Sequence, residues 1–240
     1  MKIMIKIGTA AIFDSTKQKI KENIIESLAK EVSNLIKEGN EIIIVSSGAV
    51  GGGKNLVKGN NEIGLKQAQS SIGQVKLMEK YSQIFSKYNT HIAQFLLTSQ
   101  DIKNKNSLKN IIETYKHLKR ENVIPIVNEN DITSLEELSF GDNDFLATEL
   151  LLGLDFEKLI ILTEIGVLIK NKEPITSSNF FSVEDYDKMK IPPTGFGGLK
   201  SKLEVAEKII KSGKECIIAK AGDSIQDILL KKASATRFYL

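Results

Sequence analysis

Apolar positions along this chain form two patterns that alternate from one end to the other. Short, nearly continuous apolar runs are typical of buried strands, and they lie at residues 1–7, 41–45, 91–95, 123–127, 158–162 and 215–219. Between them, apolar residues recur at helical spacing at 20–36, 63–88, 108–119, 143–154 and 201–212. This alternation predicts an α/β fold, a three-layer sandwich with a mainly parallel central sheet. The least regular stretch, 167–191, is expected to hold a short hairpin after Gly166.

Two clusters of acidic and amide side chains flank a short loop after the strand predicted at 123–127. The first is Asn128-Glu129-Asn130-Asp131, and the second, Gly141-Asp142-Asn143-Asp144, opens the helical segment 143–154. Either cluster alone also fits an Asx-rich turn with a helix cap. Two such clusters in one connection between a strand and a helix supply more acidic and amide side chains than a turn and one helix cap require. Because open α/β sheets bind ligands where their strands end, we interpret the pair as a binding site.

Glycines are concentrated where strands end and where a late helix begins. The segments are Lys6-Ile7-Gly8-Thr9, Ser46 to Gly53 and Gly195 to Lys202. Glycine lets backbone N–H groups approach phosphate oxygens, and a helix N-terminus adds partial positive charge. Residues 48–55 come close to a P-loop pattern, but Asn55 stands where that loop needs a Ser or Thr hydroxyl for magnesium. The pattern therefore disfavours a P-loop.

Lys6 occupies an unusual position for a solvated lysine. It follows Ile3, Met4 and Ile5 in a strand that should be central. Burying an ammonium group there is costly unless an anion is nearby, so we expect Lys6 to meet a negative charge. The alternative is a lysine at a frayed strand end that reaches water along its apolar stem.

Taken in order, these motifs resemble those of the amino acid kinase family. Ser-Gly-Ala at 47–49, Asn-Glu-Asn-Asp and Gly-Asp-Asn-Asp together resemble the glutamate 5-kinases of that family, and the likeness runs from Lys6 to about Phe238. It implies the amino acid kinase fold as a single domain, with an amino-acid-binding lobe at about 1–155 and a nucleotide-binding lobe at about 156–240. Many such kinases carry a further RNA-binding-like domain, which would start where this sequence ends.

The resemblance implies an ATP-dependent kinase that phosphorylates the side-chain carboxylate of L-glutamate to glutamyl 5-phosphate, the first step of proline biosynthesis. It also implies Mg²⁺ with the ATP, a homo-oligomer, and glutamyl phosphate reductase as the downstream partner. Inhibition by proline at a site overlapping glutamate is expected, and the polar segment Gly53 to Gln67 is the candidate for responding to it. Other open readings are an acetylglutamate, carbamate or UMP kinase of the same fold, or a nonenzymatic module that senses an amino acid or nucleotide.

The resemblance assigns catalytic roles to three charged residues. Lys6 and Lys202 would contact the transferring phosphate from opposite sides, and Asp144 would hold both lysines in place. Phosphoryl transfer chiefly requires such positioning and positive charge. Taken alone, Lys202 could equally be a lysine in the first turn of a helix that points into water, although the helix dipole disfavours lysine at that position.

Substrate roles fall on four residues of the first lobe. By resemblance, Ser47 and Gly48 would contact glutamate, while Asp131 and Asn143 would receive its α-amino group. A carboxylate and a side-chain amide suit an ammonium ion, whereas an acetylated or nucleotide substrate would not need them. The plain alternative for Ser47 is a helix-capping hydroxyl.

The nucleotide half is less typical of the family. By resemblance, the nucleotide contacts are Lys6, Gly8, Thr163, Glu164, Phe196, Gly197, Gly198, Leu199, Lys200, Ser201 and Lys202. Ala10 replaces a usual serine, Glu164 a usual aspartate, and Phe196 a usual threonine. A bulky Phe196 would either change nucleotide affinity or pack over the base. Thr163 taken alone could be an ordinary strand-end residue.

Composition limits the other functions open to the chain. The net charge is +3 and the basic residues are dispersed lysines, with Arg120 and Arg237 as the exceptions, which disfavours a nucleic-acid surface. A lone Cys216 excludes an intrachain disulfide and a cysteine metal cluster. His91 and His117 show no metal-ligand spacing relative to the acidic clusters, so we expect no metal site built from side chains.

No apolar run has the length of a membrane span and no signal peptide is evident, so a cytoplasmic location without membrane contact is expected.

Overall fold

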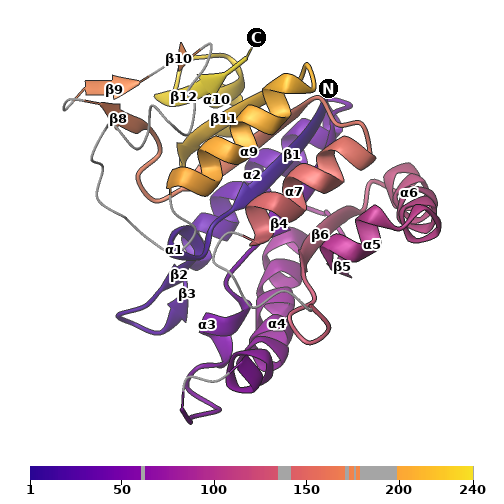
Figure 1. Cartoon of the computed structure of the whole chain (residues 1–240), viewed down its shortest axis with the longest axis vertical. Coiled ribbons are helices and arrows are strands. Elements are labelled where there is room, and N and C mark those ends of the chain that lie inside the picture. The colour runs from indigo at the N-terminus through magenta and orange to yellow at the C-terminus, as the bar shows by residue number, and fades with distance from the viewer. Residues whose placement is uncertain (61–62, 135–141, 171–172, 176, 179–198, 240) are drawn as a thin grey trace.

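A computed structural model of the chain describes residues 1–60, 63–134, 142–170, 173–175, 177–178 and 199–239. Within these residues, one large sheet lies between two layers of helices (Figure 1). Its order is β10-β12-β11-β7-β1-β4-β6-β5. In that order the strands are Ser177–Ser178, Ala235–Phe238, Glu215–Lys220, Lys158–Thr163, Lys2–Ile7, Glu41–Ser46, Ile124–Glu129 and Ile92–Leu97.

The described strands pair in parallel along the sheet, apart from β12, which runs antiparallel to β11. The strands predicted from apolar runs are all present within two residues of their predicted ends. The predicted α/β fold with a mainly parallel sheet is therefore confirmed. The strands β12 and β10 at one end of the sheet were not predicted, because four- and two-residue strands give little periodic signal.

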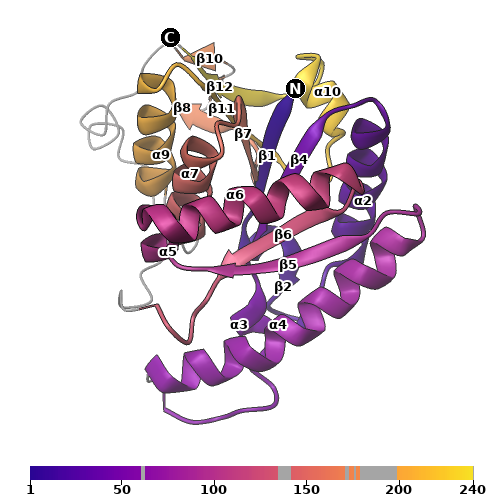
Figure 2. The same cartoon turned by 90° about the vertical axis from the view of Figure 1, so that its right-hand side faces the viewer.

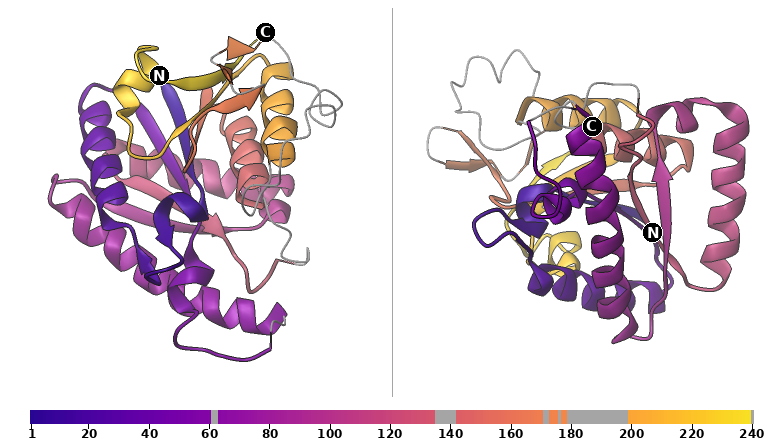
Figure 3. Two further views of the ribbon diagram at one scale, coloured as in Figure 1. Left: turned by 90° about the vertical axis from the view of Figure 1, so that its left-hand side faces the viewer. Right: turned by 90° about the horizontal axis from the view of Figure 1, so that it is seen from below.

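Helices cover both faces of the sheet (Figure 2, and the left view of Figure 3, where the sheet lies between α2 and the pair α7 and α9). One face carries α2 (Glu22–Lys37), α4 (Ile63–Ser86) and α10 (Ile225–Leu229). The other carries α5 (Ser99–Lys103), α6 (Lys105–Arg120), α7 (Asp142–Gly153) and α9 (Leu199–Lys211). Side chains of each strand alternate between the two cores, so β1 sends Ile3, Ile5 and Ile7 toward α2 and α4 and sends Met4 toward α7 and α9.

Smaller elements cluster around the ends of the strands. They are α1 (Thr9–Ile12), the hairpin of β2 (Phe13–Asp14) and β3 (Lys19–Ile20), α3 (Ala49–Gly53), and the hairpin of β8 (Leu168–Lys170) and β9 (Glu173–Ile175). The last of these confirms the hairpin expected after Gly166. From residue 179 the irregular stretch lies outside the described residues.

The helix α3 packs closely against α4, with backbone of one helix near backbone of the other (Figure 1). A Cβ atom placed on Gly53 would lie 1.9 Å from the carbonyl oxygen of Gln69, and one on Gly73 would lie 1.7 Å from that of Ala49. Neither position can accept a side chain without a backbone shift. The two helices therefore form one rigid unit next to the end of β4, called the glycine clasp below.

No helix in the described parts of the chain is both long enough and apolar enough to cross a membrane.

Candidate active site

The predicted site residues gather at the carboxyl ends of the central strands. Register aligns these ends, because Ile7 of β1 pairs with Ser46 of β4 on one side and with Leu162 of β7 on the other. The chain passes from β1 to β4 in one direction along the sheet, whereas β7 and β11 lie in the other direction. Such a reversal of strand order leaves a crevice at the carboxyl ends, where open α/β sheets bind ligands.

Three charged side chains from three elements meet at this crevice. Lys6 lies near the end of β1, Asp144 in the first turn of α7, and Lys202 in the first turn of α9. Lys6 Nζ is 2.6 Å from Asp144 Oδ1, and Lys202 Nζ is 3.2 Å from Asp144 Oδ2. The Asp144 side chain is fully buried, and those of Lys6 and Lys202 are 7% and 15% exposed. One carboxylate is thus shared by two cations.

Burial and charge compete in the protonation of this cluster. Burial acts to raise the pKa of Asp144, but the nearby ammonium groups of Lys6 and Lys202 outweigh it, so the pKa lies below its ordinary value. Burial lowers the pKa of Lys202, and Asp144 offsets only part of that effect. Lys202 therefore sits where a second anion would be stabilising. A phosphate group would supply such an anion.

A network of amides lies beside the charged cluster. Asn143, which precedes Asp144 on α7, donates from Nδ2 to Ser47 Oγ at 2.9 Å and to Asn128 Oδ1 at 2.9 Å. Its Oδ1 accepts from the backbone N–H of Glu129 at 3.2 Å. Asn128 in turn donates to Gln74 Oε1 of α4 at 2.7 Å. The network fixes Asn143, and because Ser47 Oγ accepts from it, the Ser47 O–H can donate to a ligand.

Asp131 lies on the same side of the site, in the loop that follows β6. Its Oδ2 accepts a hydrogen bond from the hydroxyl of Ser70 on α4. Burial raises the pKa of Asp131, and the Ser70 hydroxyl offsets part of that rise. A partly buried carboxylate of this kind is stabilised by a positive ligand.

Gly48 links β4 to α3 in a conformation that favours glycine. Its φ is +105°, and a Cβ atom there would lie 3.0 Å from Ile12 Cγ2. Gly8 lies across the crevice, where its N–H donates to the carbonyl of Leu162 at 3.2 Å. A Cβ atom on Gly8 would lie 3.7 Å from Lys6 Nζ, so this glycine keeps the space beside the lysine open.

The predicted nucleotide residues are only partly within the described chain. Thr163 ends β7, and its Oγ1 accepts from the Gly166 N–H at 2.9 Å. Glu164 is exposed and pairs with Lys21 at 3.3 Å. Leu199, Lys200, Ser201 and Lys202 form the first turn of α9. Phe196, Gly197 and Gly198 lie outside the described residues.

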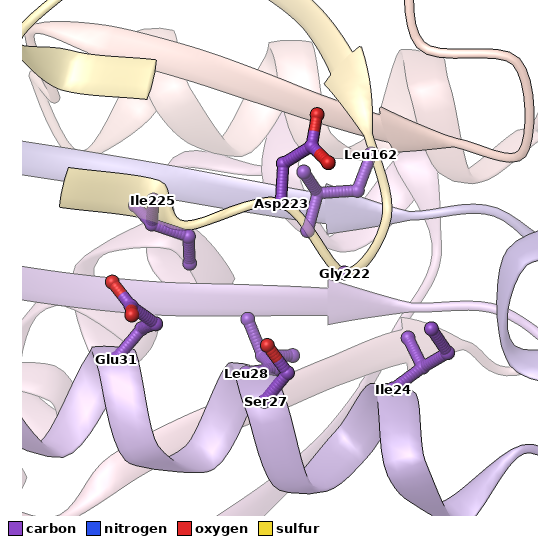
Figure 4. Close-up of a pocket in the computed structure, with 8 residues that line it drawn as sticks. All are labelled: Ile24, Ser27, Leu28, Glu31, Leu162, Gly222, Asp223 and Ile225. Carbon is purple, nitrogen blue, oxygen red and sulfur yellow. The ribbon is translucent and has the colours of Figure 1, made fainter. Parts of the chain in front are cut away.

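A separate small cleft lies on the opposite face of the sheet (Figure 4). It is formed by α2 and the loop after β11, with Leu28, Leu162 and Gly222 among its lining residues. Leu162 faces the core under α2, whereas Asp144 and Lys202 lie on α7 and α9, which cover the other face. The cleft is therefore not part of the charged site. Among the described residues, no group of three or more His, Cys, Asp or Glu side chains is arranged to hold a metal ion.

Two buried polar residues of α4 belong to the site although the sequence analysis does not single them out. Ser70 and Gln74 are 5% and 6% exposed. Ser70 contacts Asp131 in the loop after β6, and Gln74 contacts Asn128 near the end of β6. Their spacing of four places both on one helix face. Polar residues on the buried face of a helix indicate that the helix makes a buried hydrogen bond. The sequence does not show which residue is the other partner of that bond.

Comparison with known proteins agrees with this arrangement. Residues 1–220 match the model of the amino acid kinase family. The chain belongs to that family. A glutamate 5-kinase from Dictyoglomus turgidum is 35% identical over 99% of this chain and 67% of its own length. Another from Ligilactobacillus salivarius is 33% identical over 99% of this chain and 96% of its own length.

Solved structures add information about the fold. Carbamate kinase from Giardia lamblia bound to AMP-PNP superposes with a TM-score of 0.70, covering 99% of this chain and 98% of that one. At 14% identity this likeness shows the fold alone. The amino acid kinase fold and the resemblance to glutamate 5-kinases, both expected from the motifs, are thus confirmed.

Proposed function

We propose that this protein is a glutamate 5-kinase, which transfers the γ-phosphoryl group of ATP to the side-chain carboxylate of L-glutamate. The observation that carries the proposal is the pair of consecutive residues at the start of α7. Asn143 belongs to the amide network with Ser47, and Asp144 binds Lys6 and Lys202. One helical turn therefore joins a candidate amino acid site to a candidate phosphate site, as transfer between two bound substrates requires.

The proposed reaction needs no covalent intermediate and no general base. A carboxylate oxygen of glutamate attacks the γ-phosphorus, the bond from phosphorus to the bridging oxygen of ADP breaks, and ADP leaves in line. The carboxylate is already deprotonated near neutral pH. Lys6 and Lys202 would stabilise the charge that spreads over the transferring oxygens, and Asp144 would hold both lysines in place.

The acceptor would be oriented through its α-amino and carboxylate groups. Asp131 would accept the ammonium group, because a positive ligand stabilises the charged form of a partly buried carboxylate whose pKa is raised. Ser47 would donate its hydroxyl to a carboxylate of glutamate, with Gly48 beside it. Asn143 would act on the same substrate, and its contact with Ser47 Oγ supports at least an orienting role.

ATP would bind on the other side of β1. Gly8, Thr163, Glu164 and the segment 196–202 are the proposed contacts. Mg²⁺ would arrive with the nucleotide and take most of its oxygen ligands from phosphates and water, as this ion commonly does. We further propose a homo-oligomer, a cytoplasmic location, product transfer to glutamyl phosphate reductase, and inhibition by proline.

A panel of acceptors tests the proposal. Purified protein with ATP and magnesium should release ADP with L-glutamate, and hydroxylamine should trap the acyl phosphate as a hydroxamate. N-acetyl-L-glutamate, carbamate and UMP should give no release above background. Equal turnover of L-glutamate and its N-acetyl form would contradict the ammonium site. Turnover of carbamate or UMP alone would place the chain elsewhere in the family, and no turnover at all would favour a sensing module.

A further inference from the structure

The helix α4 contacts the end of β6 and the loop after it through one row of side chains. Gln67 donates to the carbonyl of Ile132 at 3.4 Å, and Ser70 donates to Asp131. One turn further on, Gln74 accepts from Asn128 at 2.7 Å. The intervals of three and four residues place this row on one face of the helix.

We propose that Ser70 is a positioning residue for the acceptor substrate, because its hydroxyl holds one oxygen of Asp131 and so turns the other toward the substrate ammonium group. This inference rests on the proposed function. Two observations support this proposal. Ser70 is buried, with 5% of its surface exposed. Its hydrogen bond within the described structure is made to one oxygen of Asp131, Oδ2.

The energetic case follows from the surroundings of Asp131. Burial disfavours its charged form, which is the form that an ammonium group needs. A hydroxyl donor favours the carboxylate and restricts its rotation at once. Without that donor, Asp131 would be held less firmly and would be a weaker partner for the substrate.

The glycine clasp explains why α4 can act as a fixed reference for this carboxylate. Gly53 and Gly73 bring the backbones of α3 and α4 into contact, so α4 cannot shift independently of the loop that carries Ser47 and Gly48. A group fixed to α4 is therefore fixed relative to the other wall of the acceptor site. Ser70 is such a group.

Ser70→Ala separates positioning from packing. Alanine is smaller and favours the helix, so the melting temperature should change by less than about 4 °C. The KM for glutamate should rise by at least about tenfold, as expected for losing a hydrogen bond to a charged group. The KM for ATP and kcat should stay within about twofold of the unmodified protein, since such a change removes ground-state binding.

Ser71→Ala is the matched control. Ser71 is the neighbouring serine of α4, is exposed, and bonds only to the Gln67 carbonyl of its own helix in the described structure, at 2.8 Å. Its KM values should match those of the unmodified protein. Calorimetric titration with glutamate in the presence of a nonhydrolysable ATP analogue measures glutamate affinity without turnover. The affinity of Ser70→Ala should be lower than that of the unmodified protein.

The outcomes separate this inference from the proposed function. Normal glutamate turnover in the unmodified protein together with an unchanged glutamate KM in Ser70→Ala would overturn the role of Ser70 alone. A large fall in melting temperature with both KM values raised would assign Ser70 to packing. Absence of glutamate turnover in the unmodified protein would overturn the proposed function and this inference with it.

Discussion

Replacing Asp144 by asparagine tests both the stability and the chemistry of the charged cluster. The Asp144 side chain is fully buried, with ammonium nitrogens at 2.6 and 3.2 Å. Asparagine keeps the shape but removes the negative charge that Lys6 and Lys202 share. Losing one partner of a buried ion pair typically costs about 3–5 kcal/mol. For a chain of this size, that loss lowers the melting temperature by about 6–20 °C.

The pH dependence of this loss has a definite sign. The pKa of Asp144 is lowered in the folded protein, so its stabilising contribution is present above the unfolded pKa, near 3.8. It disappears as the pH falls through the lower, folded value. The difference in unfolding free energy between the unmodified protein and Asp144→Asn should therefore be largest near pH 7 and should shrink below about pH 4. Urea unfolding at several pH values measures it.

A second carboxylate, partly buried, supplies the control. Glu215 is also shared by two cations, Lys158 at 2.7 Å and Arg237 at 3.6 Å, but it lies at the opposite end of β11 from the crevice. Glu215→Gln should lower stability and leave kcat unchanged, whereas Asp144→Asn should also lower kcat by about a hundredfold or more. An Asp144→Asn protein with unchanged urea midpoint and near-normal kcat would refute this account of the cluster.

Three further predictions concern the substrates. Lys202→Met should lower kcat by about a hundredfold or more, with smaller changes in either KM. Combining it with Asp144→Asn should be little worse than the more damaging single change, and fully additive losses would give Asp144 a separate role. Asp131→Ala should chiefly raise the glutamate KM, because the ammonium group loses its partner, and an unchanged KM would reduce Asp131 to a turn residue. Proline should inhibit competitively with glutamate, through the segment Gly53 to Gln67, and an unaltered initial rate at subsaturating glutamate would remove that proposal.

The long elements of the fold could be predicted from the sequence because their periodicity is set by burial. Each central strand is buried on both faces and so appears as a continuous apolar run. The short elements β12 and α10 could not be predicted, since four or five residues carry too little periodicity. The hairpin β2–β3 likewise consists of two-residue strands.

Within the site, the residues could be predicted from the sequence more readily than the contacts between them. The clusters at 128–131 and 141–144 mark a strand end and a helix start, which local patterns can reveal. The partners of these residues come from distant parts of the chain, as with Ser70 and Asp131. Asn143 illustrates the limit, because its amide nitrogen donates to Ser47 and Asn128 in this structure. Its direct contact with a substrate ammonium group stays a prediction.

The glycine clasp has a consequence for changing which acceptors this enzyme accepts. Since Gly53 and Gly73 leave no room for even a methyl group, one wall of the acceptor site cannot be remodelled by side-chain substitution at those positions. Neither can that wall retreat to admit a longer or branched acid, because α3 would have to part from α4. Engineering of acceptor length should therefore begin at the loop after β6, where, in the part of the chain that the structure describes, the Asp131 side chain is held by the hydroxyl of Ser70.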